Sequence, residues 1–295
     1  MAEVASFEKL NGSKADLSHI YNQRDPRAYF RELRKLGYAI PGRAKPLFEA
    51  LISQLRRDRQ DPIHILDLGC SYGVNAALLK HDLSMSDLYE HWGSERLADA
   101  EPDEVLEQDR RFFDGLGDSE IEVIGLDNAE NAVAFAEEAG ILDAGIAANL
   151  EIEPLPAAAC EELACVDLVT STGCVGYVTE KSFGTLLPVV TEGRSPWMAN
   201  VVLRLFPFEP IERELAGWGY VTEKLEGRTF VQRRFATAEE REGVLRQLRE
   251  RGIDPAGKEE EGHLHAEFYL SRPVEEAGRS PLRNLLAGRE FSAAT

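Results

Sequence analysis

Residues 64–79, HILDLGCSYGVNAALL, have the pattern of a short apolar strand, a turn between two glycines, and a helix of small and aliphatic residues. Asp67 stands near the end of the strand, and Gly69 and Gly73 bracket the turn. In such a unit the backbone N–H groups of the turn and the N-terminus of the helix point toward a ligand. The carboxylate of Asp67 would accept hydrogen bonds from the same ligand. The stretch therefore predicts a ligand site where this strand ends.

The turn also contains GCSYG at 69–73, which matches the G-x-S-x-G elbow in which Ser71 would be the nucleophile of a serine hydrolase. Asp167 and either His263 or His265 follow in the Ser–Asp–His order of α/β-hydrolases. However, a hydrolase elbow normally follows several strands, whereas only helices are expected before this one, and no HGGG-type oxyanion segment is present. The G-x-G-x-x-G fingerprint of nicotinamide enzymes is not met either, because the middle position of the turn is not glycine. A ligand-binding loop is therefore favoured, and the hydrolase is kept as the weaker alternative.

The composition is that of a soluble globular protein of one large or two small domains, since 43% of the 295 residues are hydrophobic and 29% are charged. The formal net charge is −19, and a surface this acidic repels phosphate backbones, so we expect no nucleic-acid partner. No apolar run is long enough to span a bilayer, and the first ten residues do not have the layout of a secretory signal. We therefore expect a cytoplasmic protein with no membrane partner.

The four cysteines, Cys70, Cys160, Cys165 and Cys174, have no His or Cys partner at a zinc-ribbon spacing. We expect them to be reduced and mostly buried, as is usual in the cytoplasm, and we expect no metal site. The sequence leaves the oligomeric state open, with a homodimer as one alternative.

Predicted strands and helices alternate from residue 63 onward. Strands are expected at 63–68, 120–126, 145–148, 166–170, 197–206, 220–225 and 265–270, and helices at 26–36, 44–57, 129–139, 182–190, 210–217 and 237–251. This alternation predicts an α/β fold with a mostly parallel, doubly wound sheet and helices on both faces. Ligands bind such sheets at the carboxyl ends of the strands. Asp67, Asp127, Asn149, Thr170 and Ser171 all follow expected strand ends and should share one rim.

Four segments, in this order, resemble the motifs of class I S-adenosylmethionine-dependent methyltransferases. LDLGCSYG at 66–73 is similar to their first motif, and GLD at 125–127 is similar to the end of their second strand, where an acidic residue holds the ribose. ANLE at 148–151 resembles the third motif, near the adenine, and VDLVTS at 166–171 resembles the fourth, at the edge of the methyl-transfer site. The resemblance spans about residues 61–272. It implies a Rossmann-like, doubly wound sheet of seven strands with a reversed last strand, and an N-terminal helical cap.

Three features depart from the family pattern. Ser71 replaces the middle glycine of the first motif, and Asn149 stands where an aspartate is common. The separation of Asp67 and Asp127 is sixty residues, which is far above the ~20 expected between a glycine-rich turn and its ribose acid. An insertion of acidic helical character at about 81–119 accounts for the excess.

The expected domain division is an N-terminal helical cap at 1–60, a core at 61–272 and a C-terminal tail at 273–295. The insertion at 81–119 leaves from the edge of the sheet opposite the ligand, so we expect it to serve a structural or subunit-contact role. A second insertion at 226–263 starts at the ligand rim and is expected to cover the substrate.

The resemblance implies an enzyme that binds S-adenosyl-L-methionine as cofactor and transfers its methyl group in line to a small-molecule acceptor. The cofactor-binding residues that it implies are Asp67, Gly69 and Gly73 at the methionine part, Asp127 at the ribose, and Asn149 with Leu150 at the adenine, and the set is completed by Cys70, Ser71, Asn128, Thr170 and Ser171. If the acceptor must lose a proton, Tyr177 and His263 are the candidate catalytic residues. A protein acceptor is the alternative within the fold, since an acidic surface would complement a basic target.

Overall fold

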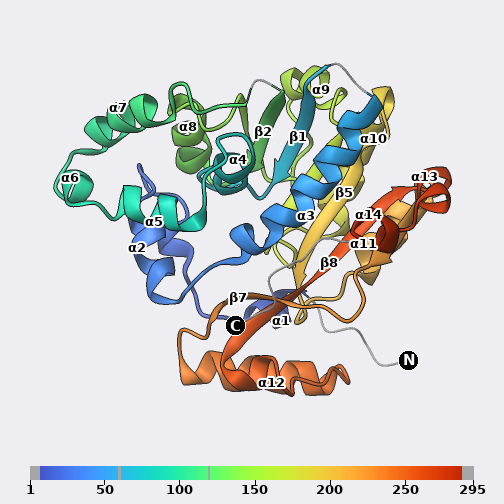
Figure 1. Ribbon diagram of the computed structural model, residues 1–295. Coiled ribbons are helices and arrows are strands. Elements are labelled where there is room, and N and C mark those ends of the chain that lie inside the picture. Colours follow the sequence, from blue (N-terminus) through green and yellow to red (C-terminus); the bar gives the residue numbers. More distant parts are fainter. Residues whose placement is uncertain (1–6, 59–60, 119, 288–295) are drawn as a thin grey trace.

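An eight-stranded sheet forms the centre of the computed structural model, which describes residues 7–58, 61–118 and 120–287 (Figure 1). The strands lie in the order β3-β2-β1-β4-β5-β8-β6, and β7 pairs with β8 beside this series. Strands β1 to β5 run parallel, whereas β8 is antiparallel to β5, β6 and β7. The strands are β1 (Ile63–Leu68), β2 (Ile121–Asp127), β3 (Ala144–Ala147), β4 (Leu168–Thr172), β5 (Trp197–Leu203), β6 (Tyr220–Lys224), β7 (Phe230–Arg234) and β8 (His263–Pro273).

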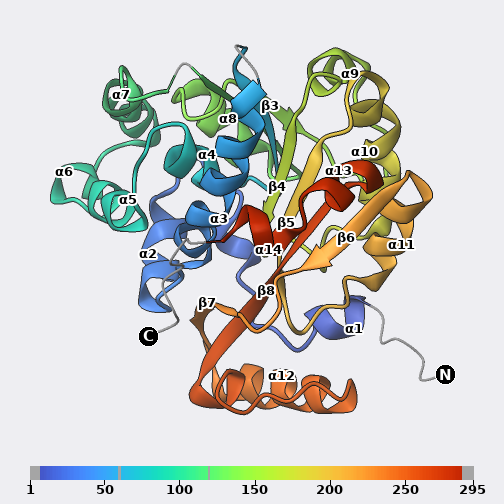
Figure 2. The same cartoon turned by 45° about the vertical axis from the view of Figure 1, so that its right-hand side comes forward.

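Helices cover both faces of this sheet (Figures 1 and 2). α3 and α4 pack together on one face, and α9, α10 and α11 pack in a row on the other. The helices are α1 (Phe7–Asn11), α2 (Arg27–Lys35), α3 (Ile40–Leu55), α4 (Val74–Leu79), α5 (Met85–Trp92), α6 (Glu95–Ala98), α7 (Pro102–Phe113), α8 (Glu130–Glu138), α9 (Ala157–Leu163), α10 (Glu180–Gly193), α11 (Glu209–Gly217), α12 (Ala238–Glu250), α13 (Val274–Arg279) and α14 (Leu282–Leu285). The predicted fold class, a doubly wound and mostly parallel α/β sheet with a reversed strand near its edge, is confirmed.

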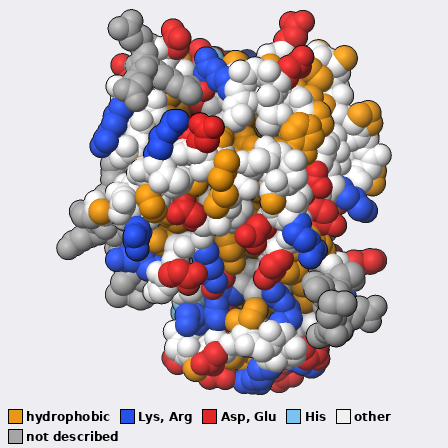
Figure 3. All heavy atoms as spheres, turned by 90° about the vertical axis from the view of Figure 1, so that its right-hand side faces the viewer, with side chains coloured by type: hydrophobic (Ala, Val, Ile, Leu, Met, Phe, Trp, Pro, Cys, Tyr) orange, Lys and Arg blue, Asp and Glu red, His pale blue; other side chains and the backbone are white. Residues whose placement is uncertain are grey.

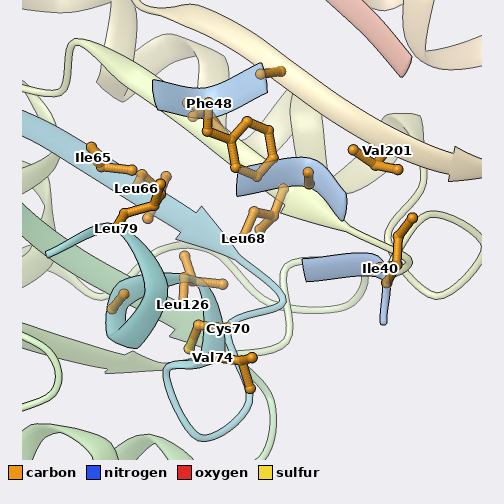
Figure 4. Close-up of a cluster of buried hydrophobic side chains, with 14 of the residues drawn as sticks. Ile40, Phe48, Ile65, Leu66, Leu68, Cys70, Val74, Leu79, Leu126 and Val201 are labelled. Atoms are coloured by element: carbon orange, nitrogen blue, oxygen red, sulfur yellow. The ribbon is translucent and has the colours of Figure 1, made fainter. Parts of the chain in front are cut away.

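The central strand β1 is apolar on both faces because helices cover the sheet on both sides. Ile65, Leu66 and Leu68 are all less than 2% exposed, and Figure 4 shows them in one buried cluster with Phe48 of α3. The exception among its fully buried residues is Asp67, a carboxylate with no exposed surface at all. A buried carboxylate is costly unless it is hydrogen-bonded, so its presence in the core marks a special position.

Strand β7, which lies inside the 226–263 insertion, was not predicted, so the sheet has eight strands rather than seven. Its sequence FVQRR ends in polar and charged residues and gives no apolar alternation. Its strand conformation comes from pairing with β8, from Phe230 opposite Ala266 to Arg234 opposite His263. Tertiary pairing with β8 therefore determines the structure of this segment, which the local sequence pattern does not indicate.

The predicted bounds of β4 are wrong by two residues, since the strand runs over Leu168–Thr172 rather than 166–170. Its ladder with β5 continues to Thr172, which pairs with Val201. Thr170 and Ser171 therefore lie inside the strand instead of following it.

The two insertions lie at different ends of the molecule (Figure 1). Helices α5, α6 and α7 belong to the insertion at 81–119, where α5 packs on α2 and α7 packs on α8. Buried Asp109 accepts hydrogen bonds from Trp92 Nε1 (2.7 Å) and pairs with His91 Nε2 (2.6 Å), which fixes α5 to α7. The insertion at 226–263 carries β7 and α12 and lies at the lower end of the sheet in Figure 1.

The surface carries charges of both signs. On the face shown in Figure 3, acidic and basic side chains are interspersed, so the net negative charge does not gather into one acidic area there. Within the described part of the chain, every helix is too short or too polar to span a lipid bilayer. Among the same residues, the His, Cys, Asp and Glu side chains form no group of three that could bind a metal ion.

Candidate active site

A cavity of about 550 Å³ opens at the carboxyl ends of β1, β2, β3 and β4. This is where an open parallel sheet binds its ligands. Several segments form the wall. They are the end of β1 with the following turn and the start of α4 (Leu68, Gly69, Cys70, Ser71, Val74, Asn75), the end of β2 and the next residues (126–129), the loop after β3 (148–151), the end of β4 and the segment that follows into α10 (Thr172, Gly173, Cys174, Tyr177, Val178, Ser182), the N-terminal region (14–18, Tyr21, Asn22, Tyr29, Leu33, Tyr38, Pro41), and Gln232 and Arg233 of β7. None of the described residues of 81–118 belongs to this wall, whereas β7 of the second insertion does.

The turn after β1 brings backbone close to the cavity because Gly69 has a left-handed conformation, with φ +76°. A Cβ atom at this glycine would lie 2.5 Å from the Cβ of Cys174, so no larger residue fits without moving the segment after β4. Ser71 is also left-handed, with φ +49°, which costs a residue other than glycine roughly 1–2 kcal/mol. Its N–H donates to Asp127 Oδ2 at 2.9 Å, and this bond holds the turn in place.

Asp127 ends β2 and faces the cavity. Its Oδ1 accepts from the N–H of Ala129 at 3.0 Å, so one backbone N–H binds each carboxylate oxygen. Burial raises the pKa of this carboxyl. A carboxylate has about four lone-pair sites, and the free ones are available to a ligand with paired hydroxyl groups.

Asp67 lies directly beneath the turn and does not itself reach the wall of the cavity. Its Oδ1 accepts from Asn75 Nδ2 (2.7 Å) and from Thr170 Oγ1 (3.0 Å). Burial raises its pKa to about 7. Among the described residues, Asp67 Oδ2 and Asn75 Oδ1 are buried and have no hydrogen-bond donor. Since Asn75 lines the cavity, its Oδ1 is an acceptor to which a ligand amino group could donate.

The loop after β3 is fixed to the N-terminus of α10 by Glu151. This carboxylate accepts from the N–H of Thr179 at 2.8 Å and from the hydroxyl of Ser182 at 2.6 Å. Asn149 uses its Oδ1 to accept from the N–H of Glu151 at 3.1 Å, so its side-chain oxygen shapes the loop. The apolar side chain of Leu150 is left on the cavity wall. Sequence reasoning missed the anchoring role of Glu151.

The predicted site residues fall into two groups. Those on the cavity wall are Gly69, Cys70, Ser71, Asp127, Asn128, Asn149, Leu150 and Tyr177. Those that the structure does not place on the wall are Asp67, Gly73, Thr170, Ser171 and His263. Thr170 and Ser171 are buried inside β4, where Ser171 donates to Asn200 Oδ1 at 2.7 Å, and the following residues Thr172 to Cys174 take their place on the wall.

His263 begins β8 opposite Arg234, outside the cavity wall, and Gly73 precedes α4. The Ser–Asp–His set of a hydrolase does not assemble. Asp167 precedes β4 and pairs with Arg194, at the amino ends of the strands and away from Ser71. His265 contacts Thr229 Oγ1 at 3.1 Å instead of a serine of the turn.

The N-terminal region and β7 contribute several residues that sequence reasoning did not assign to the site. Tyr29 packs edge-on against Tyr21, with ring centroids 5.5 Å apart, and both rings line the cavity. Arg233 is only 4% exposed, although it stands in a stretch with two adjacent arginines, Arg233 and Arg234. The expectation of an N-terminal helical cap had pointed to this region of the chain.

No protein-family model and no curated protein matches the sequence. Among solved structures, the chain is similar to the plantazolicin methyltransferase BpumL bound to SAH and a desmethylPZN analog, with 13% identity, coverage of 90% of this chain and 98% of that one, and a TM-score of 0.42. It is also similar to magnesium protoporphyrin IX methyltransferase (ChlM) from Synechocystis PCC 6803 with bound SAM, at 11% identity, 91% and 92% coverage and a TM-score of 0.38. A TehB-like SAM-dependent methyltransferase from Corynebacterium glutamicum has 15% identity, 81% and 93% coverage and a TM-score of 0.39. Likeness at this level carries no argument about function, which must come from the chain's own residues.

Proposed function

We propose that this chain is an S-adenosylmethionine-dependent methyltransferase acting on a small-molecule acceptor. The observation that carries the proposal is one cavity in which three features meet. The turn at Gly69 offers closely approaching backbone, Asp127 offers a buried carboxylate, and Asn75 with Asp67 offers acceptors that lack donors. Their sequence order is the order of the motifs that resemble the methyltransferase family.

Each feature suits one part of the cofactor. Asp127 would accept hydrogen bonds from the two ribose hydroxyl groups. The unpaired Asn75 Oδ1, backed by Asp67, would accept from the amino group of the methionine part. Leu150 and Ala148 give the loop after β3 an apolar surface for the adenine ring. The cofactor carries no phosphate, which agrees with the position of the Asp67 carboxylate beneath the turn. The negative charge of this carboxylate would repel the pyrophosphate of a dinucleotide cofactor.

When bound, S-adenosylmethionine supplies a methyl group activated by a positively charged sulfur. The chain's own contribution is to bring the acceptor into line with that group and to keep water out. Tyr21, Tyr29 and Tyr38 line the cavity with aromatic surface and serve the exclusion of water. Tyr177 is on the wall and 60% exposed, and since its pKa is raised rather than lowered, its phenol is neutral near pH 7. We therefore assign Tyr177 to orienting the acceptor, and His263 would reach an acceptor only if that acceptor extended beyond the cavity.

A small-molecule acceptor is favoured by the size of the cavity. Its volume of about 550 Å³ falls within the range of about 300–1,000 Å³ typical of small-molecule sites. The N-terminal region and β7 close over it from two sides. A protein acceptor would instead need a groove that leaves room for a polypeptide segment.

Calorimetric titration with S-adenosylhomocysteine tests the proposal. We expect the wild-type protein to bind it, and we expect Asp127→Ala to weaken binding about 10- to 100-fold, since a hydrogen bond to a charged group contributes about 1.5–3 kcal/mol. Asp114→Ala, an exposed change after α7, is the control and should bind like the wild type. Circular dichroism of each variant checks that the fold is intact. Binding that is absent in the wild type, or unchanged in folded Asp127→Ala, would contradict the proposal.

A further inference from the structure

Two cations and one carboxylate lie together at the end of the cavity formed by the N-terminal region and β7. Lys14 and Arg233 line the cavity, and Glu240 of α12 lies behind them. Arg233 and Glu240 are 4% and 3% exposed and form a two-pronged ion pair. The group therefore carries one more positive charge than negative charge.

Glu240 has no free position for Lys14. Its Oε1 accepts from Arg233 Nη2 (2.5 Å) and from the N–H of Ala15 (2.9 Å). Its Oε2 accepts from Arg233 Nη1 (2.9 Å) and from the N–H of Ala236 (2.7 Å). Four hydrogen bonds fill the capacity of a carboxylate, so Glu240 neutralises Arg233 and leaves the Lys14 ammonium without a counter-ion.

Lys14 is held against aromatic rings rather than against a carboxylate. Its Nζ lies 4.7 Å from the ring centroid of Tyr177 and 5.3 Å from that of Phe206. Across the residues that the structure describes, no carboxylate oxygen lies within 4 Å of this ammonium. Asp16 lines the same cavity but is exposed and accepts from the N–H of Ser18 at 2.9 Å. Burial and the charge of Arg233 lower the pKa of Lys14 to about 8, so it is still mostly charged at pH 7.

Gln232 provides a second donor beside this charge. Gln232 is 6% exposed and lines the cavity. Its amide packs closely against Gly173, since a Cβ added to that glycine would lie 2.5 Å from Gln232 Nε2. Its side chain makes no hydrogen bond with residues 7–58, 61–118 and 120–287, so the amide is available to a ligand in the cavity. An ammonium without a counter-ion and an amide without a protein partner thus face the same cavity, and both can bind a ligand there.

We propose that the methyl acceptor is an anion, with a carboxylate-type group bound by Lys14 and Gln232 at this end of the cavity. The inference rests on the proposed function, because it concerns the acceptor of the methyl group. The rings of Tyr177 and Phe206 would pack against the apolar part of the acceptor next to its charged group. The acceptor class is therefore a small organic acid rather than an amine or a neutral lipid.

The test uses two fluorinated probes of the same shape, 4-fluorobenzoate and 4-fluorobenzamide, observed by fluorine NMR at pH 7 with and without S-adenosylhomocysteine. We expect the wild type to bind the anion about 10-fold more tightly than the amide, as one charge-assisted hydrogen bond would give. Lys14→Met should abolish this preference, and Lys14→Arg should keep it. Gln232→Leu should weaken benzoate binding, whereas Lys35→Met, an exposed lysine paired with Glu32, should change nothing.

Equal binding of the two probes to the wild type, or a preference that survives Lys14→Met, would overturn the inference. A preference lost in both Lys14→Met and Lys14→Arg would also overturn it, since arginine keeps the positive charge to which the inference attributes the preference. S-adenosylhomocysteine binding is measured on the same samples. If the cofactor product binds and no anion preference is found, this inference fails alone, whereas no cofactor binding refutes the proposed function.

Discussion

Replacing the buried Asp67 with asparagine should stabilise the ligand-free protein at neutral pH. The folded protein raises the pKa of this carboxyl from 3.8 to about 7, because burial penalises its charged form. Between these two values the folded state binds more protons than the unfolded state, so stability falls as pH rises from about 4 to about 7. With about 1.4 kcal/mol per pKa unit, the penalty reaches about 4 kcal/mol at pH 8. Asp67→Asn keeps the Oδ1 acceptor for Asn75 and Thr170 and removes that penalty.

Urea unfolding at pH 5 and pH 8 measures the effect. Asp67→Asn should be more stable than the wild type at pH 8 by a few kcal/mol, and the gain should be clearly smaller at pH 5. Asp114→Asn, at an exposed position, should show no such dependence. S-adenosylhomocysteine should bind more weakly to Asp67→Asn, since Asn75, which meets the ligand, then loses the carboxylate to which it is hydrogen-bonded. Equal stability changes at the two pH values, or destabilisation at pH 8, would refute the reasoning.

Two further predictions concern the frame of the cavity. Glu240→Gln leaves the buried Arg233 guanidinium without its counter-ion and should lower the free energy of unfolding, measured by urea titration, by about 3–5 kcal/mol. Glu242→Gln, on the exposed side of α12, is the control and should have little effect. Equal losses of stability in the two variants would contradict the ion-pair argument. Gly69→Ala places a Cβ 2.5 Å from Cys174 and should abolish S-adenosylhomocysteine binding in calorimetry. Gly37→Ala has similar left-handed strain, at φ +64°, but no atom within 4 Å, so it should retain binding; loss of binding in both variants would point to backbone strain instead.

The parts of the fold that sequence could predict are those where a local pattern and the tertiary structure agree. The strand at 63–68 has the predicted bounds, because its apolar run, its terminal acid and the following glycine turn all indicate the same structure. Asp127 was predicted to lie beside this turn, and its bond to the N–H of Ser71 shows that it does. These two segments are sixty residues apart, but parallel pairing of β1 with β2 brings their ends together.

The parts that sequence could not predict depend on pairing and burial between distant segments. The end of β4 was misplaced because only its ladder with β5 shows that Thr170 and Ser171 remain inside the sheet. Lys14 and Gln232 carry no motif, and both become important because β7 and the N-terminal region meet over the cavity. Arg233 has the sequence context of a solvated basic residue, but it is buried because Glu240 of α12 pairs with it.

The central claim is that the cavity at the ends of β1 to β4 binds S-adenosylmethionine, and a crystal structure with S-adenosylhomocysteine tests it most directly. We expect the ribose hydroxyl groups at Asp127, the adenine beside Leu150, and the amino group within hydrogen-bond distance of Asn75. Electron density for the ligand at any other place on the protein, or a cavity that stays empty at saturating ligand, would contradict the account.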